Sequence, residues 1–262
     1  MPGQAIITGA YGAIGQAIAA GLAQHGFDLV LVGRNEYRLK ETLANLQKRY
    51  PATAVRFAVV DLSRETEISR FAKTFSGSLQ VLVNNAVTAP KVRTETPEGI
   101  EMQWATNVLG YYWMMHHFTP YLSGQPDARI VNVASYWAGG FDPSDPEFKK
   151  RAYNNDVAYR QSKQADRMLT AAFARKLKPL GISVNSCHPG DVNSKVSNDL
   201  GFGGDETPRQ GADTPLWLAT SPEAAGETGH YVENRQKKSC PFMRDTNGMA
   251  LLMDLCGSYP VT

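Results

Sequence analysis

The chain has 262 residues, of which 42% are hydrophobic and 20% are charged, and its formal net charge at pH 7 is +2. Such a chain is long enough for one large globular domain with a substantial buried core. The small net charge removes any electrostatic argument for nucleic acid or an acidic membrane surface as a partner. The three cysteines show no metal-ligand spacing, so we expect reduced thiols and no metal site.

No apolar stretch approaches the ~20 residues that a helix needs to cross a bilayer. The first strand is expected to begin at about Gln4, which leaves no room for a signal or transit peptide. The sequence therefore predicts a cytoplasmic protein without an integral membrane segment.

Short apolar runs alternate with helical segments along the chain. The runs are rich in β-branched residues and too short for helices, which suits parallel strands covered on both faces. Residues 15–26 and 35–50 have helical periodicity instead. The expected strands lie at residues 5–8, 28–33, 55–62, 79–86, 128–135 and 182–190.

This alternation predicts an α/β fold, a doubly wound parallel sheet of the Rossmann type with helices on both faces. In such a sheet, ligands bind beyond the C-terminal ends of the strands, near the point where the strand order reverses. Since no internal repeat or linker divides the chain, residues 1–262 are expected to form a single domain.

Three glycines, Gly9, Gly12 and Gly15, follow the first expected strand and precede a helix. Glycine permits a tight turn and lets the backbone approach a pyrophosphate, whose charge the free N–H groups of the helix then hold. The loop therefore predicts a nucleotide site, although a glycine-rich turn without a ligand is the alternative. Its residues are Gly9, Ala10, Tyr11, Gly12, Ala13, Ile14 and Gly15.

An arginine, Arg34, follows the second expected strand in the segment LVGRNEY. NAD-specific proteins tend to place an acidic residue there for the ribose 2′-hydroxyl, whereas an arginine suits the 2′-phosphate of NADP. Arg34 therefore favours NADP(H) over NAD(H). The alternative is a surface arginine at the start of a helix.

Tyr159 and Lys163 are four residues apart in the segment AYRQSK, and hence on one face of a helix. A tyrosine ionises near pH ~10 in isolation, so it is a poor base at neutral pH. A lysine one turn away stabilises the phenolate, and the pair could then exchange the proton that accompanies hydride transfer. A mere surface pair is the alternative.

Besides the glycine loop and the pair Tyr159 and Lys163, the chain contains Asp61-Leu62, NNA at residues 84–86, Asn107 in TNVLG, Ser135 in VNVAS and Pro189-Gly190 in HPGDV. In their order, these motifs resemble those of the short-chain dehydrogenase/reductase family, from residue 8 to about residue 194. The resemblance implies that Tyr159 is the general acid/base and that Ser135 hydrogen-bonds the substrate oxygen. It also implies that Lys163 binds the nicotinamide ribose and that Asn107 holds a water linking Lys163 to solvent. His188 is expected to be a loop residue without a catalytic role. Together with Arg34, the implied cofactor-binding residues are Thr8, Gly9, Tyr11, Gly12, Ala13, Ile14, Gly15, Asp61, Leu62, Asn85, Ala86, Tyr159, Lys163, Pro189, Gly190 and Val192.

Two positions depart from the pattern of the family. Ala13 replaces an expected glycine, which makes the spacing similar to that of the family's epimerase-like branch. Val87 replaces the glycine that often follows the NNA motif. We expect Gly12 to allow the close backbone approach one position early, so both changes leave cofactor binding intact.

The expected cofactor-binding part covers about residues 1–135, and substrate loops are expected at about 136–158 and 192–215. The first loop is longer than the family's minimum, and it resembles loops of the retinol-dehydrogenase-like and protochlorophyllide-reductase-like subgroup. The second is rich in glycine and is expected to close on the substrate. Four aromatic residues could line an apolar pocket or simply pack in the core: Trp137, Phe141, Phe202 and Trp217.

The leading hypothesis is an NADP(H)-dependent oxidoreductase that acts on a carbonyl or alcohol of a mostly apolar small molecule. The alternatives are an epimerase or dehydratase that uses a bound cofactor transiently, and a regulator that senses NADP(H) without turnover. The sequence leaves the substrate, the direction and the oligomeric state open, a homo-oligomer included.

Overall fold

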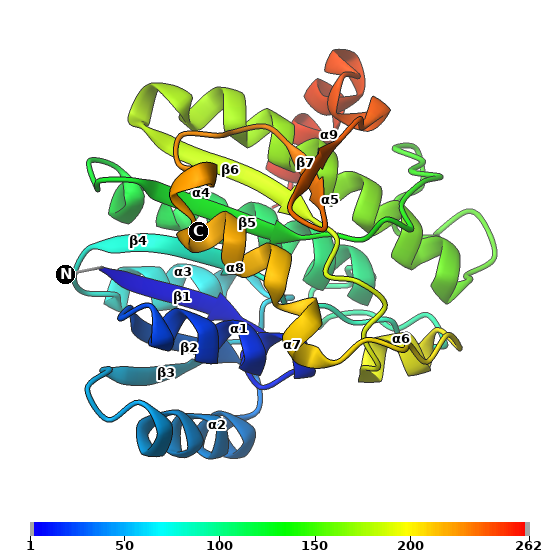
Figure 1. Cartoon of the computed structure of the whole chain (residues 1–262). Helices are drawn as coiled ribbons and strands as arrows, with labels where there is room; N and C mark the ends of the chain where they lie inside the picture. The colour runs from blue at the N-terminus through cyan, green and yellow to red at the C-terminus, as the bar shows by residue number, and fades with distance from the viewer. Residues whose placement is uncertain (1–2, 260–262) are drawn as a thin grey trace.

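The computed structural model describes residues 3–259, so the two ends of the predicted domain, residues 1–2 and 260–262, lie outside the described residues. In the described part, eight strands form one sheet in the order β3-β2-β1-β4-β5-β6-β7-β8 (Figure 1). All neighbours are parallel except β7 and β8. The strands are β1 (Gln4–Thr8), β2 (Asp28–Gly33), β3 (Val55–Val59), β4 (Leu79–Asn84), β5 (Ala128–Val133), β6 (Ile182–Cys187), β7 (Tyr231–Glu233) and β8 (Gln236–Lys238).

Helices cover both faces of this sheet, which confirms the predicted fold class. A first core cluster lies on the face covered by α3, α4 and α5, with α9 packed against α5, and a second lies on the face of α1, α2 and α8. The longer helices are α1 (Ala13–Gln24), α2 (Glu36–Arg49), α3 (Glu65–Thr74), α4 (Gly110–Leu122), α5 (Asn155–Leu177), α8 (Asp213–Thr220) and α9 (Thr246–Gly257). The short ones are α6 (Lys195–Asp199), α7 (Pro208–Gly211), the π-helix η1 (Trp104–Leu109) and the 3-10 helices η2 (Lys178–Leu180), η3 (Pro222–Ala224) and η4 (Pro241–Met243).

The strands end earlier than their apolar patterns predict. The prediction extended β3 to residue 62 and β6 to residue 190, but they end at Val59 and Cys187. β4 and β5 likewise end two residues early, just before Asn85 and Ala134. The first residues beyond β3, β5 and β6, which are Val60, Ala134 and His188, still donate a backbone hydrogen bond to the neighbouring strand. The chain then leaves the sheet and forms its C-terminal rim, where ligands bind in such folds. The pair β7 and β8 was not predicted, because three-residue strands carry too little pattern.

Helix α5 places the expected catalytic pair. Its start is capped by the Asn154 side chain, which accepts a hydrogen bond from the N–H of Val157 at 3.0 Å. After the 3-10 turn η2, the chain reverses at Gly181, whose φ of 72° suits glycine. The helix lies beside β6, so residues in its first turns reach the rim of the sheet.

A buried carboxylate organises the loop between β5 and α5. Asp145 accepts backbone hydrogen bonds from Lys149, Lys150 and Arg151 at 2.7–3.2 Å. Nearby, the carboxylate of Glu147 accepts a hydrogen bond from the backbone N–H of Glu101 at 3.0 Å. These bonds give the expected substrate loop a defined shape without regular secondary structure.

Within residues 3–259, no helix combines the length and the apolar character needed to span a membrane.

Candidate active site

Two adjoining cavities open at the C-terminal rim of the sheet. The larger, of about 960 Å³, lies over the glycine loop and the ends of β2 and β4. The smaller, of about 260 Å³, lies over the ends of β5 and β6 and the start of α5. Ile14, Asn85, Val87, Ser194 and Val196 line both, so the cavities form one continuous cleft.

The glycine loop forms the floor of the larger cavity. Gly9 has a φ of +62°, and a Cβ added to Gly15 would lie 2.3 Å from the carbonyl oxygen of Gly9, so neither position accepts a side chain without strain. Gly12 is the N-cap of α1, where no side chain caps the helix and the first turn holds no acidic residue. The first N–H groups of α1 therefore lack side-chain partners at the cavity, where a helix favours an anion.

Thr8 and Asn85 support this loop from below. The Thr8 hydroxyl accepts hydrogen bonds from the backbone N–H groups of Asn85 at 2.8 Å and Ala86 at 3.1 Å. The Asn85 amide donates to the carbonyl oxygen of Thr8 at 2.9 Å. Thr8 is almost completely buried and, like Ala10, does not line the cavity, whereas the other residues of the loop do.

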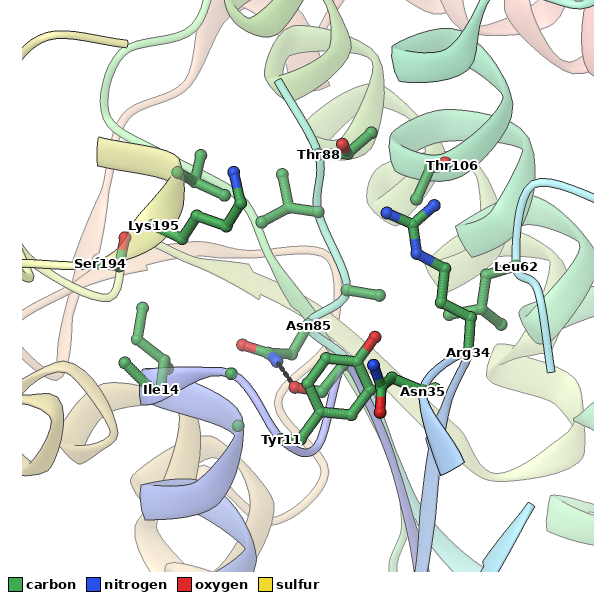
Figure 2. Close-up of a pocket in the computed structure, with 18 of the residues that line it drawn as sticks. Tyr11, Ile14, Arg34, Asn35, Leu62, Asn85, Thr88, Thr106, Ser194 and Lys195 are labelled. Carbon is green, nitrogen blue, oxygen red and sulfur yellow. Dashed lines mark hydrogen bonds between the residues drawn. The ribbon is translucent and has the colours of Figure 1, made fainter. Parts of the chain in front are cut away.

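Basic side chains surround the part of the cavity near β2. Figure 2 shows Arg34 and Lys195 entering from opposite sides, the first from the end of β2 and the second from α6. Arg38 lies over the Tyr11 ring at 4.7 Å and donates a hydrogen bond to the Tyr11 carbonyl oxygen at 3.0 Å. The ring fits because Gly33 has no side chain: a Cβ there would lie 2.5 Å from the ring.

The smaller cavity brings together Ser135, Tyr159 and Lys163, which all line it. Ser135 follows β5, and its hydroxyl accepts a hydrogen bond from the backbone N–H of Trp137 at 3.1 Å. Lys163 is almost completely buried, and its ammonium lies 5.8 Å from the centre of the Tyr159 ring. The sequence prediction thus identified three side chains that the fold gathers in one pocket.

Within the described residues, the ammonium of Lys163 donates hydrogen bonds to two groups. Its Nζ donates to the carbonyl oxygen of Val133 at 3.1 Å and to the carboxylate of Asp166 at 2.8 Å. Because an ammonium has three N–H donors, one is left for a group in the cavity. The contact with Asp166 was not predicted.

Asn107 lies beside the pocket without lining either cavity. It belongs to the π-helix η1, a departure from α geometry that is frequent at functional sites. Its side chain exchanges hydrogen bonds with the backbone of Thr88, at 2.9 and 3.0 Å, and donates to the hydroxyl of Ser162 at 3.2 Å. Asn107 therefore connects α5 to the loop after β4.

Of the four aromatic residues considered for the pocket, Trp137 and Phe202 line it, with ring centres 4.0 Å apart. Phe141 and Trp217 do not. Phe141 stacks on the buried Trp104, and Trp217 packs at the edge of the second core cluster. Contacts between residues that are distant in the sequence therefore determine which of these rings face the pocket.

The segment after β6 forms the other wall of the pocket. Pro189, Gly190 and Val192 line it, and the chain folds back so that the N–H of Glu206 donates to the carbonyl oxygen of Asp191 at 3.0 Å. Residues between these points form α6, and α7 follows. The segment predicted to close on the substrate thus contains short helices beside the pocket.

His188, which was expected to be a loop residue, lines the smaller cavity next to Pro189 and Gly190. Its ring packs against Tyr136 at 4.7 Å, and burial lowers its pKa to about 4. The ring is therefore neutral near pH 7 and does not serve as a cation at the pocket.

Several residues that the sequence analysis did not name as cofactor-binding also line the larger cavity, among them Arg38 and, from the predicted substrate loop 192–215, Ser194 and Lys195. Arg38 could have been found, because it follows Arg34 by four residues near the start of a helix. Among the predicted cofactor residues, Gly9, Tyr11, Gly12, Ala13, Ile14, Gly15, Arg34, Asp61, Leu62, Asn85 and Ala86 line the larger cavity.

Comparisons with known proteins agree with this geometry. A family model described as short chain dehydrogenase matches residues 4–201. A "Probable oxidoreductase" of Streptomyces antibioticus is 33% identical over 255 residues, covering 89% of this chain and 85% of that protein. Human retinol dehydrogenase 13 is 27% identical, covering 94% and 81%, in line with the predicted retinol-dehydrogenase-like subgroup.

A solved structure of an uncharacterised protein from Mycobacterium paratuberculosis superposes with a TM-score of 0.81 and 26% identity, over 97% of this chain and 91% of that one. The matched motifs, the fold and the relatives all lead to one conclusion. The chain belongs to the short-chain dehydrogenase/reductase family.

Proposed function

We propose that the protein is an NADP(H)-dependent oxidoreductase that interconverts a carbonyl and an alcohol on a mostly apolar small molecule. The observation that carries this proposal is the gathering of Ser135, Tyr159 and Lys163 in a pocket that is continuous with the cavity over the glycine loop. A dinucleotide along this cleft would have one end at β2 and its nicotinamide near Tyr159.

The residues of the larger cavity fit a dinucleotide phosphate. The uncapped start of α1 and the closely packed loop around Gly9 and Gly15 suit the pyrophosphate. Arg34 and Arg38 suit the additional 2′-phosphate of NADP(H), since arginine forms paired hydrogen bonds with phosphate oxygens. Asp61 and Leu62, after β3, line the same end of the cavity and would contact the adenine.

The bound nicotinamide would supply or accept the hydride, and this chain's own residues would move the proton. In the direction of reduction, the Tyr159 hydroxyl donates a proton to the substrate oxygen, and in oxidation the phenolate accepts it. The hydroxyl of Ser135 orients that oxygen by a hydrogen bond. Lys163 uses its remaining N–H donor on the nicotinamide ribose, and its charge stabilises the phenolate. The role of Asn107 in holding a water beside Lys163 belongs to the same proposal.

An apolar substrate is supported by the rings of Trp137 and Phe202 at the smaller cavity. In this proposal, residues 136–158 and 192–215 select the substrate, while the part up to about residue 135 binds most of the cofactor. Both parts belong to the single domain that we propose for residues 1–262.

The test follows NADPH absorbance while a panel of aliphatic and aromatic carbonyl compounds is offered to the wild type and to Tyr159→Phe. We expect turnover by the wild type and a loss of about 10²–10⁴-fold in Tyr159→Phe, with NADPH affinity retained. Tyr121→Phe is the matched control, because it removes a phenol that donates to the backbone of Ala72, away from both cavities.

Near-normal rates in Tyr159→Phe would refute the proton-transfer role. NADPH binding without oxidation by any carbonyl compound would favour the sensing regulator, and conversion of a substrate without net change in NADPH would favour the epimerase or dehydratase.

A further inference from the structure

A buried carboxylate lies directly behind the predicted catalytic pair. Asp166 follows Lys163 by three residues on α5 and is fully buried. Its Oδ2 accepts the hydrogen bond from the Lys163 ammonium at 2.8 Å, while its Oδ1 has no hydrogen-bond partner among residues 3–259. A buried carboxylate oxygen without a partner is costly, which calls for a functional explanation.

The Lys163 ammonium is close to both Asp166 and Tyr159. The ammonium lies 2.8 Å from the carboxylate and 5.8 Å from the centre of the Tyr159 ring. Coulomb interactions are strong at a site so poorly accessible to water. A negative charge next to the ammonium therefore cancels part of the field that would stabilise a Tyr159 phenolate.

Among the described side chains, three neutral groups and one cation surround this pair. Tyr111 on α4, Cys187 on β6 and Cys256 on α9 face the pair, and burial raises the pKa of each, so all three are neutral near pH 7. The buried guanidinium of Arg167, one turn after Lys163 on α5, donates to the carbonyl oxygen of Ser135 and lies over the Tyr231 ring, so it does not replace the negative charge of Asp166. Burial also raises the pKa of Asp166 itself, and the neighbouring Lys163 opposes this shift.

We propose that Asp166 is a positioning residue that holds the Lys163 ammonium against β5 and, by partly neutralising it, sets the pH at which Tyr159 ionises. This inference rests on the proposed function, because it concerns the proton donor of the same site. The unpartnered Oδ1 fits this role, because within residues 3–259 Lys163 is the one cation that donates a hydrogen bond to this carboxylate, and the charge of the carboxylate therefore acts mainly on Lys163.

The proposal makes a directional statement about the substitution Asp166→Asn. Asparagine has nearly the same shape, and its side-chain oxygen still accepts a hydrogen bond from Lys163, but the negative charge is absent. The uncompensated ammonium then stabilises the phenolate more strongly. We expect the ionisation midpoint of Tyr159 to fall by about one pH unit.

The test measures tyrosinate absorbance in the near ultraviolet during a pH titration, so it requires no substrate. The Tyr159 contribution is the difference between each protein and the same protein carrying Tyr159→Phe. Thr170→Val is the matched control, because Thr170 is equally buried one turn further along α5. Its hydroxyl donates to the backbone carbonyl oxygen of Asp166 and accepts from the Asn132 amide, but does not contact Lys163. A merely structural role of Asp166 would leave the midpoint unchanged.

A midpoint lower than that of the wild type in Asp166→Asn, with no change in Thr170→Val, supports the proposal. An equal or higher midpoint overturns it, while leaving the proposed function intact. If the wild type shows no ionisation that depends on Tyr159, the proton-transfer role of Tyr159 fails, and the role of Asp166 fails with it. Should Asp166→Asn not fold, Asp166→Ala is expected to shift the midpoint in the same direction and is judged by the same outcomes.

Discussion

Replacing Arg34 by alanine tests whether the cleft selects NADP(H). Arg34 and Arg38 are four residues apart, and both line the end of the larger cavity next to β2. A hydrogen bond between charged partners contributes about 1.5–3 kcal/mol, which corresponds to a change of about 10- to 150-fold in Kd. We therefore expect Arg34→Ala to weaken NADPH binding by such a factor and to leave NADH binding nearly unchanged.

Arg38→Ala is expected to act differently, because Arg38 has a second contact. Its guanidinium also holds the carbonyl oxygen of Tyr11 in the glycine loop, at 3.0 Å. Its loss should therefore weaken NADPH strongly and NADH to a smaller extent, through the position of the loop.

The assay titrates NADPH and NADH into each variant and follows the fluorescence of the reduced nicotinamide. Arg49→Ala is the control, since Arg49 is a basic residue at the other end of α2, where it contacts Tyr50. Equal affinities of the wild type for the two cofactors, or an equal loss of both in Arg34→Ala, would refute the assignment of Arg34 to the 2′-phosphate.

Three further outcomes follow from contacts elsewhere in the protein. Alanine in place of Trp137 or Phe202 should raise KM for apolar substrates by about tenfold while NADPH affinity stays the same, and a parallel loss of NADPH affinity would contradict this placement of the rings. Gly15→Ala should abolish cofactor binding in a titration, because its Cβ would meet the carbonyl oxygen of Gly9 at 2.3 Å; retained binding would show that the loop can relax. Burial raises the pKa of Glu101 to about 7, so ionisation of this carboxyl opposes folding. The contribution of Glu101 to the stability of the fold is therefore full below pH ~4.5 and is lost as the pH rises through about 7. Glu101→Gln should therefore lose less Tm than the wild type between these two pH values, and parallel Tm curves for the two proteins would contradict this.

Local patterns in the sequence were sufficient to predict much of the fold and part of the candidate site. The alternation of apolar runs and helical segments identified β1 to β6 and the fold class, because each element is recognised from neighbouring residues. The loop from Gly9 to Gly15 and the pair Tyr159 and Lys163 are equally local, since their spacing alone places them at a helix start and on one helix face. The ends of the strands were less predictable, because apolar residues continue past the last ladder bond.

The tertiary structure decided which distant segments meet. The sequence offered four aromatic rings for the pocket, and only packing between the loop after β5 and the segment after β6 brings Trp137 and Phe202 together there. The strands β7 and β8 are too short to carry a pattern and form only because β6 offers an edge to pair with. Asp166 looks like any polar residue within a helix, and its contact with Lys163 becomes significant only because α4, α9 and the sheet enclose both groups and exclude the water that would otherwise screen their charges.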